Sequence, residues 1–165
     1  MYRTSLFFIS LALALVLAGP AQAISEGSSA PSFEITTFDG RKIELQALVE
    51  QGPILLFFWT TWCHYCEEEM PEIQDFKEEY ASQGLQVLGI NPGWRDSEQR
   101  ARSFRRQLEV DMSLAFDKTM RLSDMYALQG VPTLFLLDDR GKVLYRGHGI
   151  TPELRRILDR FLADN

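Results

Sequence analysis

Two cysteines, the only ones in the chain, are separated by two residues in the segment Trp62-Cys63-His64-Tyr65-Cys66. A pair at this spacing can open and close as a disulfide, and its thiolate can exchange with a disulfide in another molecule. Since there is no third cysteine, the two must react with each other or with a partner. A bridge that closes so short a loop restricts the unfolded chain little, which argues against a purely structural disulfide.

The residues around this pair predict a junction between a buried strand and a helix. Residues 54–59 are all apolar, which is typical of a strand covered on both faces. Apolar residues then recur at helical spacing, with Pro71 expected to kink the helix, at Met70, Ile73, Phe76 and Tyr80. Unpaired backbone N–H groups at a helix N-terminus stabilise a thiolate. We therefore predict Cys63 as the attacking thiol and Cys66 as the resolving thiol.

The rest of the chain alternates strand and helix patterns. Strands are expected at 33–36, 42–45, 85–90, 112–116, 133–137 and 143–145, and helices after Asp96 or Ser97, within 118–128 and after Thr151. Asp39-Gly40 marks the turn of the first hairpin. This order indicates an α/β fold with a mostly parallel central sheet and an antiparallel closing edge.

The first 23 residues have the pattern of a secretory signal. Arg3 precedes an apolar run over 6–18, and Ala21-Gln22-Ala23 matches a small-x-small cleavage site. The run is shorter than the roughly 20 residues that a membrane-spanning helix needs, although an uncleaved anchor remains the alternative. Small polar residues predict a flexible leader over 24–30, and residues 31–165 form one domain.

The charge balance limits the possible partners. The formal net charge is −6, so we expect no nucleic-acid role. A secretory signal implies an oxidising compartment, which for this protein we expect to be the periplasm. Membrane contact is expected only through the signal segment, if that segment is not cleaved.

Four motifs along the chain match one known family. They are Phe57-Phe58-Trp59-Thr60-Thr61-Trp62-Cys63-x-x-Cys66 followed by Glu69 and Pro71, Gly130-Val131-Pro132-Thr133, Ala30-Pro31-x-Phe33, and Asp139-x-Gly141-Lys142-Val143. They resemble the thioredoxin superfamily and, more closely, the exported TlpA/ResA-like reductases. The resemblance covers roughly residues 30–162. It implies a thioredoxin-like fold, with a central mixed β-sheet flanked by helices and an N-terminal β-hairpin extension, and a cis Pro132 beside the cysteines.

The resemblance also implies roles around the cysteines. Glu69 occupies the position of a glutamate that takes part in the thiol chemistry of TlpA/ResA-like proteins, whereas Phe57 replaces the buried aspartate of thioredoxin. Client proteins are expected to contact Trp62, His64, Tyr65, Val131 and Pro132, with an extended client segment pairing with the Val131 backbone. Many relatives carry proline at the position of Tyr65, so a reduction potential cannot be transferred from them.

The function that follows is thiol–disulfide exchange without a cofactor. The resemblance implies a reductant of client proteins, such as apocytochrome c or a copper-site protein, recharged by a membrane thiol transporter of the DsbD or CcdA kind. A copper-delivering chaperone could use His64, His148 and the cysteines. A peroxiredoxin-like peroxidase would suit Thr60, three residues before Cys63, but Leu56 replaces the proline such enzymes carry. A disulfide oxidase or isomerase of the same fold is the third alternative. We expect the arginines of the helix at 100–106 to form a solvated face.

Overall fold

A five-stranded sheet forms the centre of the protein. The computed structural model describes residues 24–164. The strand order is β5-β4-β3-β6-β7, with β3 Ile54–Phe58, β4 Gln86–Asn91, β5 Ser113–Phe116, β6 Thr133–Leu137 and β7 Val143–Gly147. Strands β3, β4 and β5 are parallel, whereas β6 runs antiparallel to both β3 and β7. The mixed sheet is confirmed, but the expectation of a mostly parallel core is wrong for β6, because an apolar run carries no signal of strand direction.

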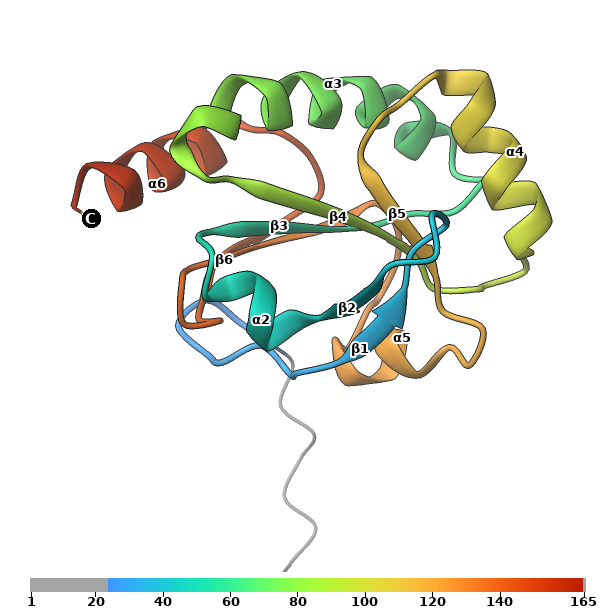
Figure 1. Cartoon of the computed structure of the whole chain (residues 1–165), viewed down its shortest axis with the longest axis horizontal. Coiled ribbons are helices and arrows are strands. Elements are labelled where there is room, and N and C mark those ends of the chain that lie inside the picture. Colours follow the sequence, from blue (N-terminus) through green and yellow to red (C-terminus); the bar gives the residue numbers. More distant parts are fainter. Residues whose placement is uncertain (1–23, 165) are drawn as a thin grey trace, which may run out of the picture.

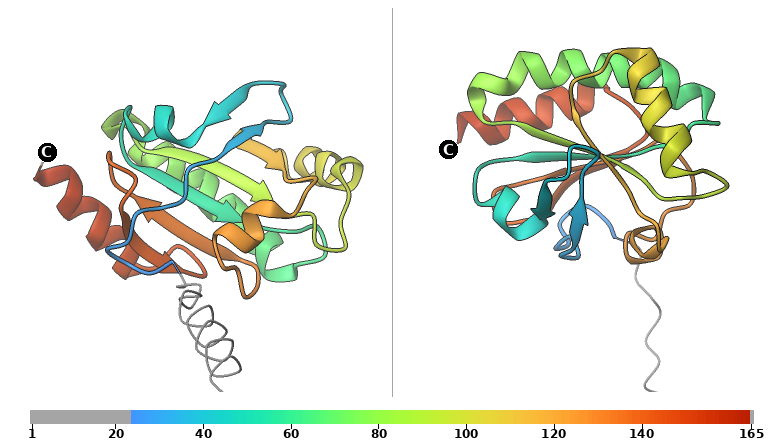
Figure 2. Two further views of the ribbon diagram at one scale, coloured as in Figure 1. Left: turned by 90° about the horizontal axis from the view of Figure 1, so that it is seen from below. Right: turned by 45° about the vertical axis from the view of Figure 1, so that its right-hand side comes forward.

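Helices cover both faces of this sheet. Figures 1 and 2 show one face under α3, α4 and α6, and the other face under α2, α5 and a separate hairpin. The helices are α2 Leu45–Val49, α3 His64–Tyr80, α4 Glu98–Leu108, α5 Arg121–Met125 and α6 Pro152–Ala163. Alternate residues of β3 enter two apolar clusters: Leu55 and Phe57 pack with the cysteines under α3, and Leu56 and Phe58 pack on the other side. The site is therefore supported by a fully buried central strand.

Local sequence signals explain where the long helices begin and end. Cys63 is the N-cap of α3, and the helix continues through Pro71. A short 3-10 turn follows, and Gly84 ends it with a φ of 86°, a conformation that glycine adopts without steric cost. In α6 the Thr151 hydroxyl accepts the Leu154 N–H, and Pro152 occupies the first turn as predicted.

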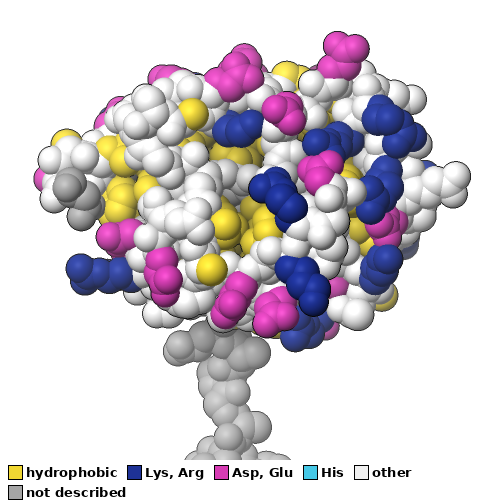
Figure 3. All heavy atoms as spheres, viewed as in Figure 1, with side chains coloured by type: hydrophobic (Ala, Val, Ile, Leu, Met, Phe, Trp, Pro, Cys, Tyr) yellow, Lys and Arg dark blue, Asp and Glu magenta, His cyan; other side chains and the backbone are white. Residues whose placement is uncertain are grey.

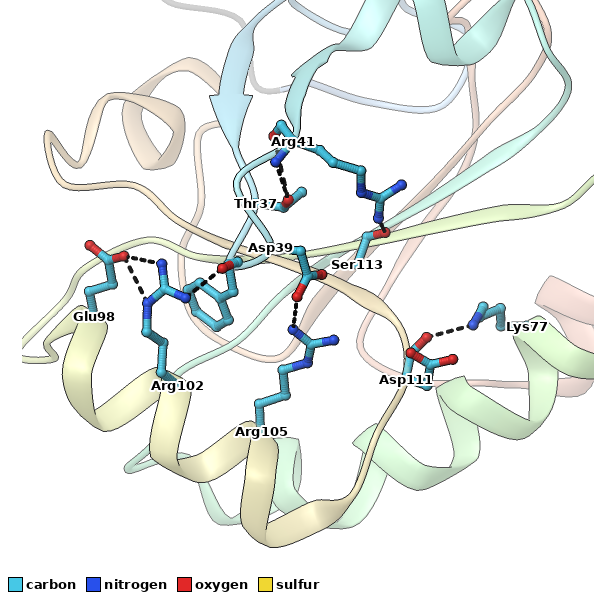
Figure 4. A network of polar contacts seen from close by, with 10 residues as sticks. Thr37, Asp39, Arg41, Lys77, Glu98, Arg102, Arg105, Asp111 and Ser113 are labelled. Carbon is cyan, nitrogen blue, oxygen red and sulfur yellow. Dashed lines mark hydrogen bonds and ion pairs between the residues drawn. The ribbon is translucent and has the colours of Figure 1, made fainter.

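The N-terminal hairpin forms its own two-stranded sheet and is fastened to α4. Strands β1 Glu34–Thr36 and β2 Lys42–Glu44 pair antiparallel. As Figure 4 shows, Arg102 donates to the Phe38 carbonyl at 2.6 Å, and Arg105 pairs with Asp39 at 2.8 Å. The solvated face expected for this helix is therefore wrong for these two arginines, which bind the hairpin. Figure 3 shows acidic side chains interspersed among the basic ones on this side of the molecule.

The segment expected to be a flexible leader lies along β7 in the structure. The Gly27 N–H donates to the Val143 carbonyl at 2.8 Å, and the Val143 N–H donates to the Ser28 carbonyl at 2.9 Å. Ile24 is buried, and Arg146 donates to its carbonyl at 2.8 Å. Small polar residues gave no sign of this pairing, because the contacts are made by the backbone with a strand more than a hundred residues away.

Two further expectations concern segment boundaries. Helix α5 is shorter than the helix expected within 118–128, because the Asp117 carboxylate turns the chain by accepting the N–H groups of Thr119 and Leu122. The signal expected over residues 1–23 lies outside the described residues. Among residues 24–164, no helix is long and apolar enough to span a bilayer.

Candidate active site

The two cysteines form a disulfide at the N-terminus of α3. Their Cα atoms are 5.2 Å apart. The Cys66 N–H donates to the Cys63 sulfur at 3.1 Å, so the first turn of the helix directs a backbone donor at the attacking sulfur. Cys63 is 7% exposed and Cys66 is fully buried. Cys63 is therefore the more accessible of the two residues, and its role as the attacking thiol stays a prediction.

The proline loop lies beside this disulfide, although it is far away in the sequence. The Val131–Pro132 peptide bond is cis, as the resemblance implied. The Val131 carbonyl oxygen lies 3.6 Å from the Cys63 sulfur. Within residues 24–164 the Val131 N–H donates to no acceptor. The loop thus presents backbone groups next to the reactive sulfur.

The residues flanking the cysteines form an exposed rim. Trp62 is 52% exposed and Tyr65 is 72% exposed, whereas Trp59 is fully buried and stacks on Phe104. His64 is also exposed, and its Nε2 lies 3.3 Å from a carboxylate oxygen of Glu68. Both partners of this pair face water, so it contributes little energy. Aromatic surface is available to a partner on both sides of the disulfide.

Glu69 lies in the same region and is held by the loop between β7 and α6. Its carboxylate accepts the Ile150 N–H. A Cβ atom added at Gly149 would lie 2.9 Å from both carboxylate oxygens, so only glycine leaves this space open. Burial raises the pKa of Glu69, the Ile150 N–H lowers it, and the charge of Glu72 raises it further, with a net upward shift. Among the described residues the carboxylate binds this loop and neither sulfur.

A pocket of about 440 Å³ joins Glu69 to the proline loop. Its lining consists of Tyr65, Glu68, Glu69, Glu72, Gly130, Val131, Pro132 and His148. His148 is the residue that sequence reasoning missed, because it was considered only as a metal ligand of unknown position. Its Nδ1 lies 2.8 Å from the Pro132 carbonyl oxygen, an acceptor, so in the neutral ring Nδ1 carries the proton and Nε2 is an acceptor. The signal available in the sequence was the position of His148 between two glycines, Gly147 and Gly149.

The loop before the cysteines is bound to the loop between β4 and α4. Thr61 donates its N–H and its hydroxyl to the Asp96 carboxylate, at 2.7 and 2.9 Å. The Trp62 indole N–H donates to the Trp94 carbonyl at 2.7 Å. The sequence identified Asp96 only as a possible helix cap, because its partner Thr61 is 35 residues away.

No group of three or more His, Cys, Asp or Glu side chains among residues 24–164 could hold a metal ion.

Comparison with known proteins places this arrangement in a family. The family model described as AhpC/TSA family matches residues 27–146, which include the disulfide and the proline loop. The chain belongs to the AhpC/TSA family.

Individual relatives and solved structures show more specifically which proteins this chain resembles. The thiol-disulfide oxidoreductase ResA of Bacillus subtilis is 34% identical over 123 residues, which are 74% of this chain and 67% of that protein. The thioredoxin-like protein YneN of Bacillus subtilis is 32% identical over 139 residues, covering 82% of this chain and 80% of that protein. A crystal structure from Chlorobium tepidum, assigned as the thiol:disulfide interchange protein DsbE, is 26% identical with a TM-score of 0.72, covering 86% of this chain and 98% of that one.

Within the AhpC/TSA family, this chain is therefore a ResA-like thiol–disulfide oxidoreductase with a thioredoxin-like fold. The Cys63–Cys66 pair is its redox-active Cys-x-x-Cys motif. The fold and the family predicted from the sequence are both confirmed.

Proposed function

We propose that the protein works outside the cytoplasm and reduces disulfides in client proteins, such as apocytochrome c or a copper-site protein. The observation that carries this proposal is the Cys63–Cys66 disulfide at the start of α3, with its less buried sulfur beside the Val131 carbonyl. A thiolate at a helix N-terminus is stabilised and can attack a disulfide. No cofactor is needed, because the electrons come from the two thiols themselves.

The exchange has two steps, which begin from the reduced protein. The Cys63 thiolate attacks one sulfur of the client disulfide, forms a mixed disulfide and releases the other client sulfur as a thiolate. The Cys66 thiolate then attacks the Cys63 sulfur, closes the internal disulfide and releases the second client thiolate. The client gains two electrons and the protein loses two. Helical donors such as the Cys66 N–H, 3.1 Å from the Cys63 sulfur, stabilise the first thiolate.

Glu69 is proposed as the proton acceptor for Cys66. The two residues are three apart on α3 and therefore share a face of the helix. Since the pKa of Glu69 is raised, chiefly by burial, its carboxylate is a stronger base than an exposed glutamate. The proton leaves Cys66 as its sulfur attacks Cys63, so a base on this side favours the resolving step.

The client is proposed to lie across the rim and the proline loop. An extended segment can pair with the Val131 backbone N–H and carbonyl as an added strand. Trp62 and Tyr65 then contact the client on either side of its disulfide. The pocket carries Glu68, Glu69 and Glu72 together with an acceptor nitrogen of His148. This lining favours clients with a Lys or Arg side chain close to the disulfide.

The proposal also includes export of the protein and re-reduction of its disulfide after each exchange. The signal pattern over residues 1–23 supports secretion into the periplasm with cleavage after Ala23. The electron donor would be a membrane thiol transporter of the DsbD or CcdA kind. In cell fractions, we expect the protein in the periplasm with an N-terminus at Ile24. Detection in the cytoplasm would reject export, and an intact residue 1 on membrane-bound protein would indicate an anchor.

The direction of exchange is tested by the reduction potential of the Cys63–Cys66 pair. A value near −270 mV, that of thioredoxin, is expected for a reductant. A value near −120 mV, that of a strong oxidant, would reject the proposed direction and support the oxidase alternative. Rapid consumption of peroxide by the purified protein would instead support the peroxidase.

A further inference from the structure

Asp96 is a charged side chain with no solvent contact, located one loop away from the reactive disulfide. It lies between β4 and α4, and its side chain is 0% exposed. A buried carboxylate is stable only when hydrogen bonds replace the water it has lost. Its partners therefore show what the charge is used for.

Four hydrogen bonds converge on this carboxylate. One oxygen accepts the Thr61 N–H at 2.7 Å and the Asn91 side-chain amide at 2.7 Å. The other accepts the Thr61 hydroxyl at 2.9 Å and the Ser97 N–H at 2.8 Å. Arg100 adds an ion pair at 3.4 Å. Two of the four bonds hold Thr61, which lies two residues before Cys63 in the loop between β3 and α3.

The carboxylate remains charged at neutral pH. Burial raises the pKa of Asp96, but the donors from Thr61, Asn91 and Ser97 lower it more, so the pKa lies below that of an ordinary aspartate. Hydrogen bonds to a charged acceptor are roughly twice as strong as neutral ones. A second connection runs beside it, since the Trp62 indole N–H donates to the Trp94 carbonyl at 2.7 Å. The β3–α3 loop is thus fixed to the β4–α4 loop just before the first cysteine.

This fixation matters differently in the two redox states. In the disulfide, the covalent bond itself holds Cys63 next to Cys66. In the dithiol, only non-covalent contacts do so, and a loop released on opening gains conformational entropy. A loop held by Asp96 gains less conformational entropy when the disulfide opens. The dithiol state is therefore stabilised less by entropy than it would be with a free loop. Asp96 therefore favours the closed disulfide and makes the pair a stronger reductant.

We propose that Asp96 is a positioning residue that sets the reduction equilibrium of the Cys63–Cys66 pair through Thr61. The inference rests on the proposed disulfide exchange at this pair and specifies which residue sets its equilibrium between disulfide and dithiol. The equilibrium concerned is disulfide plus two glutathione thiols against dithiol plus glutathione disulfide, in which two electrons and two protons move to the protein.

The test compares the parent protein with Asp96→Asn in buffers of reduced and oxidised glutathione or dithiothreitol, quenched with an alkylating agent. Asparagine keeps the shape but removes the charge and turns an amide toward donors that need an acceptor. We expect the equilibrium constant for reduction to rise about tenfold, which is about 30 mV for a two-electron couple. Thr61→Val removes only the hydroxyl bond, so its shift should be smaller and in the same direction.

Asp117→Asn is the matched control. Asp117 is another buried carboxylate after a strand of the same sheet, and it accepts from Thr119 and Leu122 within its own loop. Its substitution should lower the melting temperature without changing the equilibrium constant. The comparison with this variant separates a loss of folding stability from a change in the equilibrium between disulfide and dithiol.

Equal equilibrium constants for the parent protein, Asp96→Asn and Thr61→Val would overturn the inference, and so would equal shifts in Asp96→Asn and Asp117→Asn. If Asp96→Asn does not fold, Thr61→Val decides, and no shift in that variant overturns the inference. A parent protein that reaches no equilibrium with either buffer would contradict the proposed function instead.

Discussion

The two sides of the Cys63–Cys66 disulfide differ in how they are built. On the held side, Thr61 is bound by the Asp96 carboxylate and the Trp62 indole by the Trp94 carbonyl. On the open side, a pocket of about 440 Å³ lies between α3 and the proline loop, and it carries glutamates and His148. The held side restricts the cysteines, while the open side leaves room for a client.

We therefore expect that the reduction equilibrium of the cysteines and the recognition of clients can be changed separately. Substitutions on the held side should alter the equilibrium between disulfide and dithiol. Substitutions on the open side should alter the rate at which clients react, because that side contains the exposed rim and the raised-pKa carboxylate of Glu69. Substitutions can test this division, beginning with the sulfur that lies between the two sides.

Cys63→Ser should have the largest effect. Since both sides act through this sulfur, reduction of a disulfide-bonded model peptide should fall to the uncatalysed rate. The fold should persist, because the lost bridge closes a very short loop. Circular dichroism and the exchange rate are the measurements. Catalysis above background in this variant would show that Cys66 can attack clients by itself.

Glu69→Gln should slow exchange about ten- to hundredfold at neutral pH, within the range of general base catalysis or below it. Rate against pH is the measurement. In the parent protein the rate should fall as pH drops through the Glu69 pKa, which burial raises above its ordinary value, and the variant should lack this step. Because a raised pKa disfavours the ionised carboxylate in the folded state, it reduces stability as pH rises, so the variant should be no less stable at neutral pH.

Glu72→Gln is the control for that prediction. Glu72 lines the same pocket but is exposed and does not accept the Ile150 N–H. With a model peptide that carries no Lys or Arg near its disulfide, we expect its rate to remain within about twofold of the parent, as for other exposed charges. Equal losses in the two variants would mean that overall pocket charge, rather than a base at Glu69, determines the rate.

Gly149→Ala should give a smaller loss, of several fold. The new methyl group would lie 2.9 Å from both Glu69 oxygens and would displace the carboxylate from the Ile150 N–H. Gly130→Ala is matched to it, because Gly130 lines the same pocket and an added Cβ there meets nothing within 4 Å. Exchange kinetics with one model peptide compare the two. Equal rates would contradict the assigned position of Glu69.

Glu68→Gln should have the smallest effect. Its pair with His64 is exposed on both sides, at 62% and 76% of the side chains, so the equilibrium constant of the cysteines should shift less than about twofold. The shift should vanish in about 1 M salt, which screens exposed charges. A large shift of the equilibrium constant that persists in high salt would show that the rim also sets the equilibrium between disulfide and dithiol.

The sequence predicted several features that depend on neighbouring residues. The Cys63–Cys66 pair at a strand–helix junction follows from the apolar run of residues 54–59 and the helical spacing after it. The Thr151–Pro152 start of α6 follows from capping chemistry. These signals are local, and each comes from the physics of a few adjacent peptide groups.

Features that join distant segments could not be predicted from local residue patterns, and the proline loop beside the cysteines was expected only from the family resemblance. The contact of His148 with the Pro132 carbonyl and the bonds between Asp96 and Thr61 depend on how strands are ordered in the sheet. The reversed direction of β6 is of the same kind, since a buried apolar run reads alike in both directions. These contacts, which include the bonds between Thr61 and Asp96 on the held side, arise only when the chain is folded.

The order of attack, with Cys63 first and Cys66 resolving, can be tested by trapping the mixed disulfide. Reduced Cys66→Ser and Cys63→Ser proteins would each be mixed with a disulfide-bonded client and examined by intact mass. We expect Cys66→Ser to accumulate a covalent complex through Cys63, and Cys63→Ser to accumulate none. A long-lived complex with Cys63→Ser, or none with Cys66→Ser, would contradict it.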